Sequence, residues 1–193
     1  MQFPNEFIQP SKCLITSKTF TELTDYGFNI EVAKRGNPHK WLIDFTTRKL
    51  SHHNSREVQA FLDSLDGRYV TFTLPCPLPF MGGTNSFSVV GSNAAGSNQV
   101  NVDGLPNSTV KALMAGDFIK FDNHDKCYKI IESLDSNGVG AGVMKIHPRL
   151  QFNINDNDVI SEGVFTLRMT KDTTGLSLSG KVHEIIKVSA IEA

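Results

Sequence analysis

One stretch, residues 41–74, constrains the fold most, because it has the pattern strand, helix, strand and contains the one convincing amphipathic helix of the chain. The helix is predicted over residues 54–66, with Asn54 as its N-cap and Gly67 as its stop. A second strand is predicted over residues 68–74. Helical spacing puts four apolar residues on one face: Val58, Phe61, Leu62 and Leu65. One helix cannot bury such a stripe alone, so the strands around it must supply the surface on which it packs.

The residues before this stretch are predicted to supply two more strands. Residues 1–12 are polar and contain two prolines, which favours an irregular arm. Strands are expected over residues 13–23 and 28–33. The second of these is separated by a turn-rich segment from the strand that begins at Trp41, so we expect these two to form an antiparallel hairpin.

The composition changes at residues 75–85, where alternating prolines and a Gly-Gly pair follow one another. Prolines at that spacing exclude a central strand and favour a stiff, extended backbone, so we interpret this segment as a boundary. Short β segments with tight turns come next, which is typical of a small barrel or sandwich. These candidate strands are residues 87–90, 99–102, 117–121, 126–134 and 142–146, and their expected core is Phe118, Phe121, Tyr128, Ile130 and Ile146.

The C-terminal part is predicted to return to the first sheet. Residues 151–161 are rich in Asn and Asp and are interpreted as a linker, and strands follow at 164–169, around Leu176 and Leu178, and at 183–191. The resulting fold class is mainly β, or α+β with one amphipathic helix. Residues 1–80 with 156–193 would form a β-sandwich or barrel domain, and residues 81–155 an inserted small β-barrel of OB-like type.

Composition and motifs exclude several classes of function. The net charge of −1 gives no basic excess for nucleic-acid or membrane binding, and no apolar run reaches membrane-spanning length. Three widely spaced cysteines form no disulfide framework, which indicates a reduced protein. We expect no catalytic residues, no metal and no cofactor. The weak candidates, better explained as polar turns or a flexible hairpin, are His52-His53, Asp122, His124, Asp125, Asn153, Asp156 and Asp158, and Gly138, Gly140 and Gly142.

Several phrases of the sequence resemble the distal tail protein of tailed bacteriophages and its baseplate relatives. They are residues 26–33, 38–41, Leu50, 61–69, 71–74, 115–121, 128–130 and 148–150, and the resemblance covers about residues 20–190. It implies a β domain with one helix that forms a ring around the tail channel, with a small barrel inserted in some members. The composition break at residues 75–85 fits such an insertion.

The resemblance implies a structural virion protein that is not an enzyme. It would form a homohexameric ring that joins the tail tube protein to the hub or baseplate proteins, in a virion tail assembled in the host cytoplasm. No specific nucleic-acid binding is expected, although DNA would pass through the lumen, and no membrane is involved. The alternatives are a module that binds a host glycan or docks a receptor-binding protein, and a cell-wall hydrolase.

A ring closes by contacts between two different patches of the same chain, and two segments are candidates for them. These are the strand-and-turn region 26–41 and the proline-rich extension 75–80, whose apolar side chains have no core position of their own. The candidate interface residues are Trp41, Pro75, Pro77, Leu78, Phe80 and Met81. The alternative is that the extension folds back as a strap over its own domain.

Overall fold

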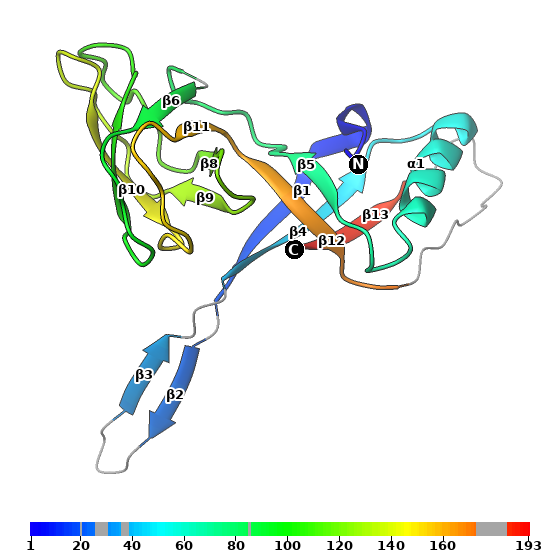
Figure 1. The fold of residues 1–193 in the computed structure, drawn as a ribbon. Helices are drawn as coiled ribbons and strands as arrows, with labels where there is room; N and C mark the ends of the chain where they lie inside the picture. Colours follow the sequence, from blue (N-terminus) through cyan, green and yellow to red (C-terminus); the bar gives the residue numbers. More distant parts are fainter. Residues whose placement is uncertain (20, 26–30, 36–38, 85, 173–184) are drawn as a thin grey trace. The chain divides into compact units, whose positions relative to one another are not determined.

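The computed structural model describes residues 1–193 except 20, 26–30, 36–38, 85 and 173–184 (Figure 1). The described part is mainly β with a single α-helix, so the predicted fold class is confirmed. The chain divides into two compact units. We call Glu6–Thr71 with Leu167–Ala193 the sheet unit, and Met1–Asn5 with Phe72–Thr166 the barrel unit.

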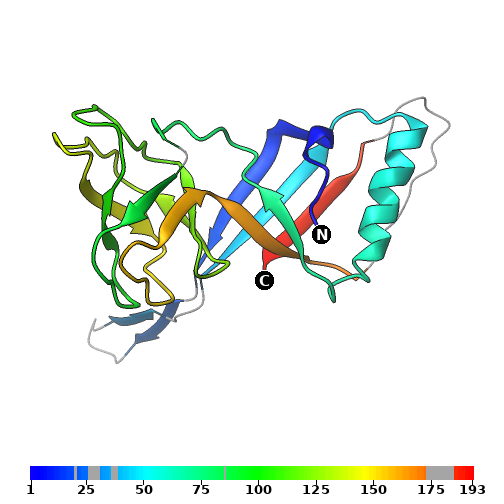
Figure 2. The same ribbon diagram turned by 45° about the horizontal axis from the view of Figure 1, so that its top comes forward.

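A five-stranded sheet has the order β1-β4-β13-β12-β5 (Figure 2). Strands β4 and β13 are antiparallel neighbours, with Phe45 opposite Val188, so the C-terminal strand completes the sheet begun near the N-terminus, as predicted. The strands are β1 (Ile8–Lys18), β4 (Lys40–Thr47), β5 (Phe72–Pro75), β12 (Val164–Met169) and β13 (Lys187–Glu192). The strand predicted around Leu176 and Leu178 lies outside the described residues.

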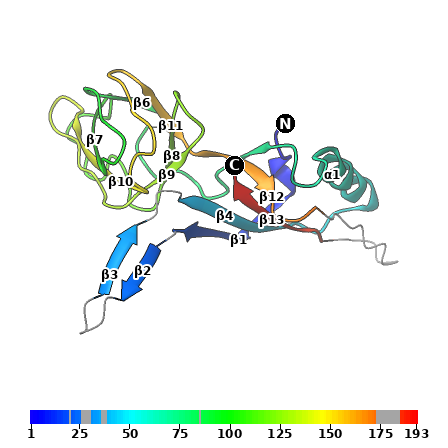
Figure 3. The same cartoon turned by 60° about the horizontal axis from the view of Figure 1, so that its bottom comes forward.

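The predicted hairpin between residues 28–33 and the Trp41 strand is wrong. Strand β3 (Glu31–Arg35) pairs with β2 (Thr21–Asp25), whereas β4 pairs with β1 and β13 (Figure 3). The chain leaves the sheet after β1, forms the β2–β3 hairpin and returns as β4, because pairing the nearest segments closes the shorter loop first. The N-terminal arm is also more ordered than predicted, with a 3-10 turn, η1 (Asn5–Phe7), directly before β1.

The helix α1 (His52–Ser64) begins earlier than predicted. Its N-cap is Ser51, whose Oγ accepts a hydrogen bond from the N–H of Asn54 at 3.3 Å. The predicted cap therefore lies inside the first turn. The helix ends at Ser64, and Gly67 takes a φ of +63° in the turn that follows, which glycine adopts without strain.

The buried face of α1 is narrower than predicted. Val58 and Leu62 are buried, as is Leu65 at the C-cap, whereas Phe61 is only half-buried. Ser55 is buried on the same side, so the centre of the buried face runs along the i, i+3, i+7 positions and leaves Phe61 at its flank. Phe61 therefore contributes less to the core than its predicted position implies.

Six strands form a closed antiparallel barrel in the order β10-β7-β6-β11-β8-β9. They are β6 (Ser86–Val89), β7 (Gln99–Asp103), β8 (Phe118–Phe121), β9 (Cys127–Ile130), β10 (Gly142–His147) and β11 (Val159–Glu162). The first five match the predicted segments. The sixth, β11, lies in the predicted linker 151–161 and closes the barrel by pairing with β6 and β8. The barrel thus differs from the five-stranded, partly open OB fold.

The barrel core contains four of its five predicted residues: Phe121, Tyr128, Ile130 and Ile146. The fifth, Phe118, is buried but points away from this core, because Ile119 and Phe121 take the inward positions of β8. Its ring packs edge-on against Phe165, with 5.3 Å between ring centroids.

The two units have different bounds from the predicted domains. Residues 72–80 and 156–166 belong to the barrel unit, because the proline-rich segment and β11 both pack with the barrel. The chain enters and leaves the barrel at one point, where the N–H of Cys76 donates to the carbonyl of Gly163 at 2.9 Å. This adjacency is what an insertion between two neighbouring strands requires.

Candidate functional site

The proline-rich segment forms a strap, residues 76–83, that is tied to the barrel by its backbone. Besides the bond from Cys76, the N–H of Met81 donates to Asp117 Oδ1 at 3.1 Å, and the N–H of Gly83 donates to the carbonyl of Ala112 at 2.8 Å. Pro77 and Pro79 have no N–H to donate, so neither residue can add a backbone bond of this kind.

Phe80 fastens the middle of the strap, since its half-buried ring packs against the barrel core. A side chain at Gly82 would place a Cβ 2.6 Å from Cε1 of Phe80, so only glycine allows this ring to lie where it does. The segment thus folds back at Phe80, as the alternative expects, but onto the barrel rather than onto the domain predicted for residues 1–80 and 156–193.

Two other predicted interface residues remain available to a partner. The side chains of Leu78 and Met81 are 43% and 59% exposed. Pro75, the last residue of β5, and Pro77 are half-buried. The structure thus brings four of the predicted residues onto one strap and leaves two of them exposed on its surface.

Trp41 is not a surface residue in this chain, because only 3% of it is exposed. Its indole meets the ring of His39 edge-on at 4.6 Å between centroids, and its N–H on the backbone donates to the carboxylate of Glu192 at 3.2 Å. On an alternating strand the large apolar residues turn inward, so Trp41 belongs to the buried face of β4. In the single chain Trp41 therefore offers little surface to a partner.

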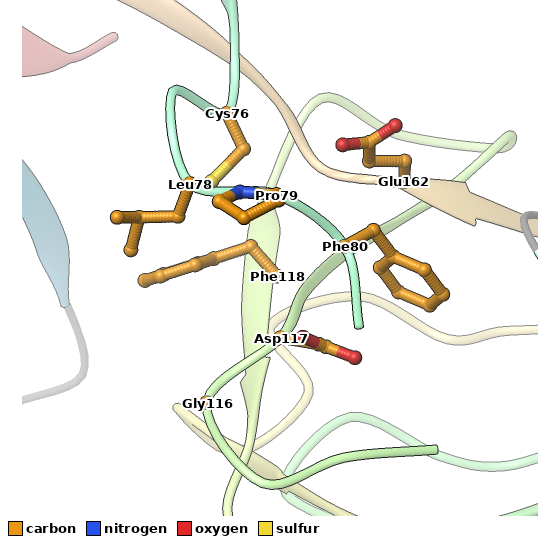
Figure 4. Close-up of a pocket in the computed structure, with 8 residues that line it drawn as sticks. All are labelled: Cys76, Leu78, Pro79, Phe80, Gly116, Asp117, Phe118 and Glu162. Carbon is orange, nitrogen blue, oxygen red and sulfur yellow. The ribbon is translucent and has the colours of Figure 1, made fainter. Parts of the chain in front are cut away.

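A small pocket of about 10 Å³ lies under the strap (Figure 4). Two of its lining residues, Asp117 and Glu162, are acidic, and most of the others are apolar. Asp117 is only 6% exposed, and its Oδ2 has no hydrogen-bond partner. The complete lining is Cys76, Leu78, Pro79, Phe80, Gly116, Asp117, Phe118 and Glu162.

The sequence did not indicate this pocket. Asp117 was predicted as the first residue of a strand and instead precedes β8, directly after Gly116, which has a φ of +107°. Glu162 ends β11, the strand hidden in the predicted linker. The only sequence signal was the Gly116-Asp117 pair, which is typical of a turn and says nothing about a carboxylate left without a partner.

The sheet unit has a wider hollow, of about 400 Å³, on the face of β1, β4 and β13 that carries Leu14. Three lysines line it, Lys12, Lys171 and Lys187, against a single carboxylate, that of Asp44. Leu14 is 61% exposed. Nearby, burial and then the charge of Asp44 raise the pKa of Cys13 to about 11, so this thiol stays protonated and a poor nucleophile.

The predicted polar turns are structural. Asn153 Oδ1, Asp156 Oδ1 and Asp158 Oδ2 accept backbone N–H groups of Ala95, Gly91 and Asn155. His52 and His53 are exposed in the first turn of α1. No group of three His, Cys, Asp or Glu side chains that could hold a metal occurs among the described residues.

The imidazole of His124 makes polar contacts through both of its ring nitrogens. Its Nε2 lies 3.0 Å from Tyr128 Oη, which also accepts the N–H of Gln151, and its Nδ1 contacts Asn123 Oδ1. A proton on Nδ1 alone satisfies both contacts. Burial, followed by the charge of Lys120, lowers the pKa of His124 despite the opposing carboxylates of Asp158, Asp125 and Asp122.

This environment predicts a loss of stability at mildly acidic pH. The folded pKa lies below the unfolded value of 6.5, so the unfolded chain binds more protons between the two values. The free energy of unfolding should be constant above about pH 7 and should fall as the pH drops below the unfolded pKa. Urea titrations between pH 7.5 and about pH 5 would measure this. In His124→Gln this component should vanish, and an unchanged slope would contradict the assignment.

No protein-family profile matches the sequence, and no curated protein matches it significantly. Within the described residues, no helix combines the length and apolar character that crossing a membrane requires.

Proposed function

We propose that this chain is a structural subunit of a bacteriophage tail tip or baseplate, which forms a ring between the tail tube and the hub. The sequence phrases that resemble distal tail proteins suggest this function. The observation that carries it is the β2–β3 hairpin, which follows an edge strand and pairs with no other described strand (Figure 1).

An isolated two-stranded hairpin is at best marginally stable in water, so it needs a surface on which to pack. Strand β1 is the edge of the five-stranded sheet and runs for 11 residues, most of them exposed. A long exposed edge is normally blunted or covered, and ring closure covers it with a neighbouring copy. The exposed edge and the hairpin therefore support the proposal of a heterologous contact between copies.

The test is the assembly state of the full chain, measured by sedimentation velocity and negative-stain imaging, with a closed ring as the expected result. In a shortened variant, residues 22–34 are replaced by Asn-Gly, which joins Thr21 to Arg35, its partner in the hairpin register. This variant should stay folded but remain monomeric. As a control, Val139→Ser on an exposed barrel loop should assemble normally. A native chain that remains monomeric, or a shortened variant that still forms rings, would refute the proposal.

A further inference from the structure

The carboxylate of Asp117 has one oxygen that the described part of the fold leaves unsatisfied. Its Oδ1 accepts the N–H of Met81, but its buried Oδ2 has no hydrogen-bond partner. A buried carboxylate oxygen without a partner costs free energy, so such atoms in folded proteins meet a water, an ion or a ligand. Asp117 is one of the residues that line the pocket under the strap (Figure 4).

The surroundings of this oxygen favour a cation. Glu162 is a second acidic residue in the lining, and neither it nor Asp117 forms an ion pair with a described residue. The ring of Phe80 lines the same space, and aromatic faces attract cations, whereas the ring of Phe118 already has Lys129 Nζ at 5.8 Å from its centroid. A volume of about 10 Å³ holds one water-sized group. An ammonium has that size, whereas the planar fork of a guanidinium is larger.

We propose that this pocket binds a primary ammonium group, and that in the assembled ring this group is a lysine side chain of the neighbouring copy. The second half of the proposal rests on the proposed ring function. Leu78 and Met81, exposed on the strap beside the pocket, are covered by the same contact. An apolar rim around a desolvated charge pair is typical of the energetic centre of a protein interface.

Charge complementarity identifies the neighbouring copy as the source of the lysine. The barrel unit has nine acidic and six basic residues, whereas the sheet unit has eleven acidic and thirteen basic residues. Lys12, Lys171 and Lys187 gather around one hollow of the sheet unit with only Asp44 opposing them. Contact between the sheet unit of one copy and the strap of the next is heterologous, as ring closure requires.

The first experiment tests the chemistry of the pocket without using assembly. Methylammonium is titrated into the full-length ¹⁵N-labelled chain, and the amide signals of Met81 and Gly116 are followed by NMR. We expect saturable shifts with methylammonium and none with tetramethylammonium, which is too large for the pocket. Asp117→Asn should abolish the shifts. An absent shift, or equal shifts with both ions, would mean that a water alone occupies the pocket, and would overturn the proposal.

The second experiment measures assembly. Asp117→Asn leaves a lysine buried without its partner and should weaken self-association by roughly 30-fold or more. Glu162→Gln, at a half-buried position, should also weaken self-association. This second variant provides the test if Asp117→Asn fails to fold. Glu132→Gln removes an exposed carboxylate that pairs with Lys145 on the same unit, and should leave assembly unchanged.

The basic side is tested by the triple variant with Gln at Lys12, Lys171 and Lys187, which should lose assembly as Asp117→Asn does. Rings that form equally well from the native chain, Asp117→Asn and Glu162→Gln would overturn the lysine contact while leaving the ring function intact. A native chain that never assembles would overturn the ring function and the neighbouring lysine together. The methylammonium titration would then decide the chemistry of the pocket alone.

Discussion

Gly140→Ala is expected to destabilise the barrel by about 3 kcal/mol or more, a loss large for one methyl group. Gly140 has a φ of +76°, and a Cβ there would lie 2.2 Å from the carbonyl oxygen of Leu105. That oxygen belongs to backbone, so the loop itself must move. The movement would break the bond from the N–H of Leu105 to the carbonyl of Gly140, now 3.0 Å long.

Gly96→Ala is the matched control for this prediction. Gly96 also has a positive φ, of +95°, but no atom lies within 4 Å of its added Cβ. Gly96→Ala should lower the free energy of unfolding only by the cost of a positive φ for alanine, about 1–2 kcal/mol. Urea unfolding of both variants measures the difference. Equal losses would mean that the close approach at Leu105 does not exist.

Residues 76–166 are expected to fold as an isolated fragment, whereas residues 84–150 are expected to remain unfolded. The shorter fragment contains the five predicted strands but lacks β11. Strand β11 pairs with β6 and β8, and Ile160 at its centre is fully buried in the barrel core. Without it the barrel opens, two edges lose their partners, and the core is exposed on one side.

Circular dichroism and the dispersion of amide signals in NMR spectra would distinguish the two fragments. Residues 76–166 should show a cooperative thermal transition, and residues 84–150 should show none. A folded shorter fragment would mean that β11 is dispensable for closure. An unfolded longer fragment would mean that the barrel depends on the sheet unit.

Strands with alternating burial that are bounded by turns were predictable from the sequence. Strand β11 was not, because the polar residues before it in the sequence obscure its pattern. Five barrel strands and β12 were found because Gly, Asn and Asp turns separate short runs of β-branched and aromatic residues. In β11 the apolar pair Val159-Ile160 follows a long Asn- and Asp-rich run, which hides it. Those polar residues are not linker-like, because they hold loops at the barrel end, as Asp156 does with Gly91.

Strand partners were harder to predict than strands. Periodicity shows which face of a segment is buried but not which segment lies beside it. The hairpin predicted between residues 28–33 and the Trp41 strand is wrong for this reason, since β4 pairs with β1, which precedes β2 and β3 in the sequence, and with β13. The predicted N-cap of the helix was three residues too late. Ser and Asn are both favoured N-cap residues, so the sequence alone does not choose between Ser51 and Asn54.

The sequence indicated the segment that contains the candidate site but not the pocket itself. Irregular prolines and apolar residues drew attention to residues 75–81 as a candidate interface, and Leu78 and Met81 in this segment are exposed. Whether they meet a partner stays a prediction. The pocket at Asp117 combines the strap, the start of β8 and the end of β11, which lie far apart in the sequence. No local sequence pattern could therefore show that one oxygen of Asp117 has no partner.

The hydrogen bond between Cys76 and Gly163 has a consequence for the order of folding. Before the barrel forms, β12 and β13 are separated from β4 by a long flexible chain, and joining them has a high entropic cost. Closing the barrel brings positions 76 and 163 together and removes most of that cost. We therefore expect pulse-labelled hydrogen exchange to show barrel amides protected before those of β13, so that the inserted module acts as an intramolecular template for the sheet into which it is inserted.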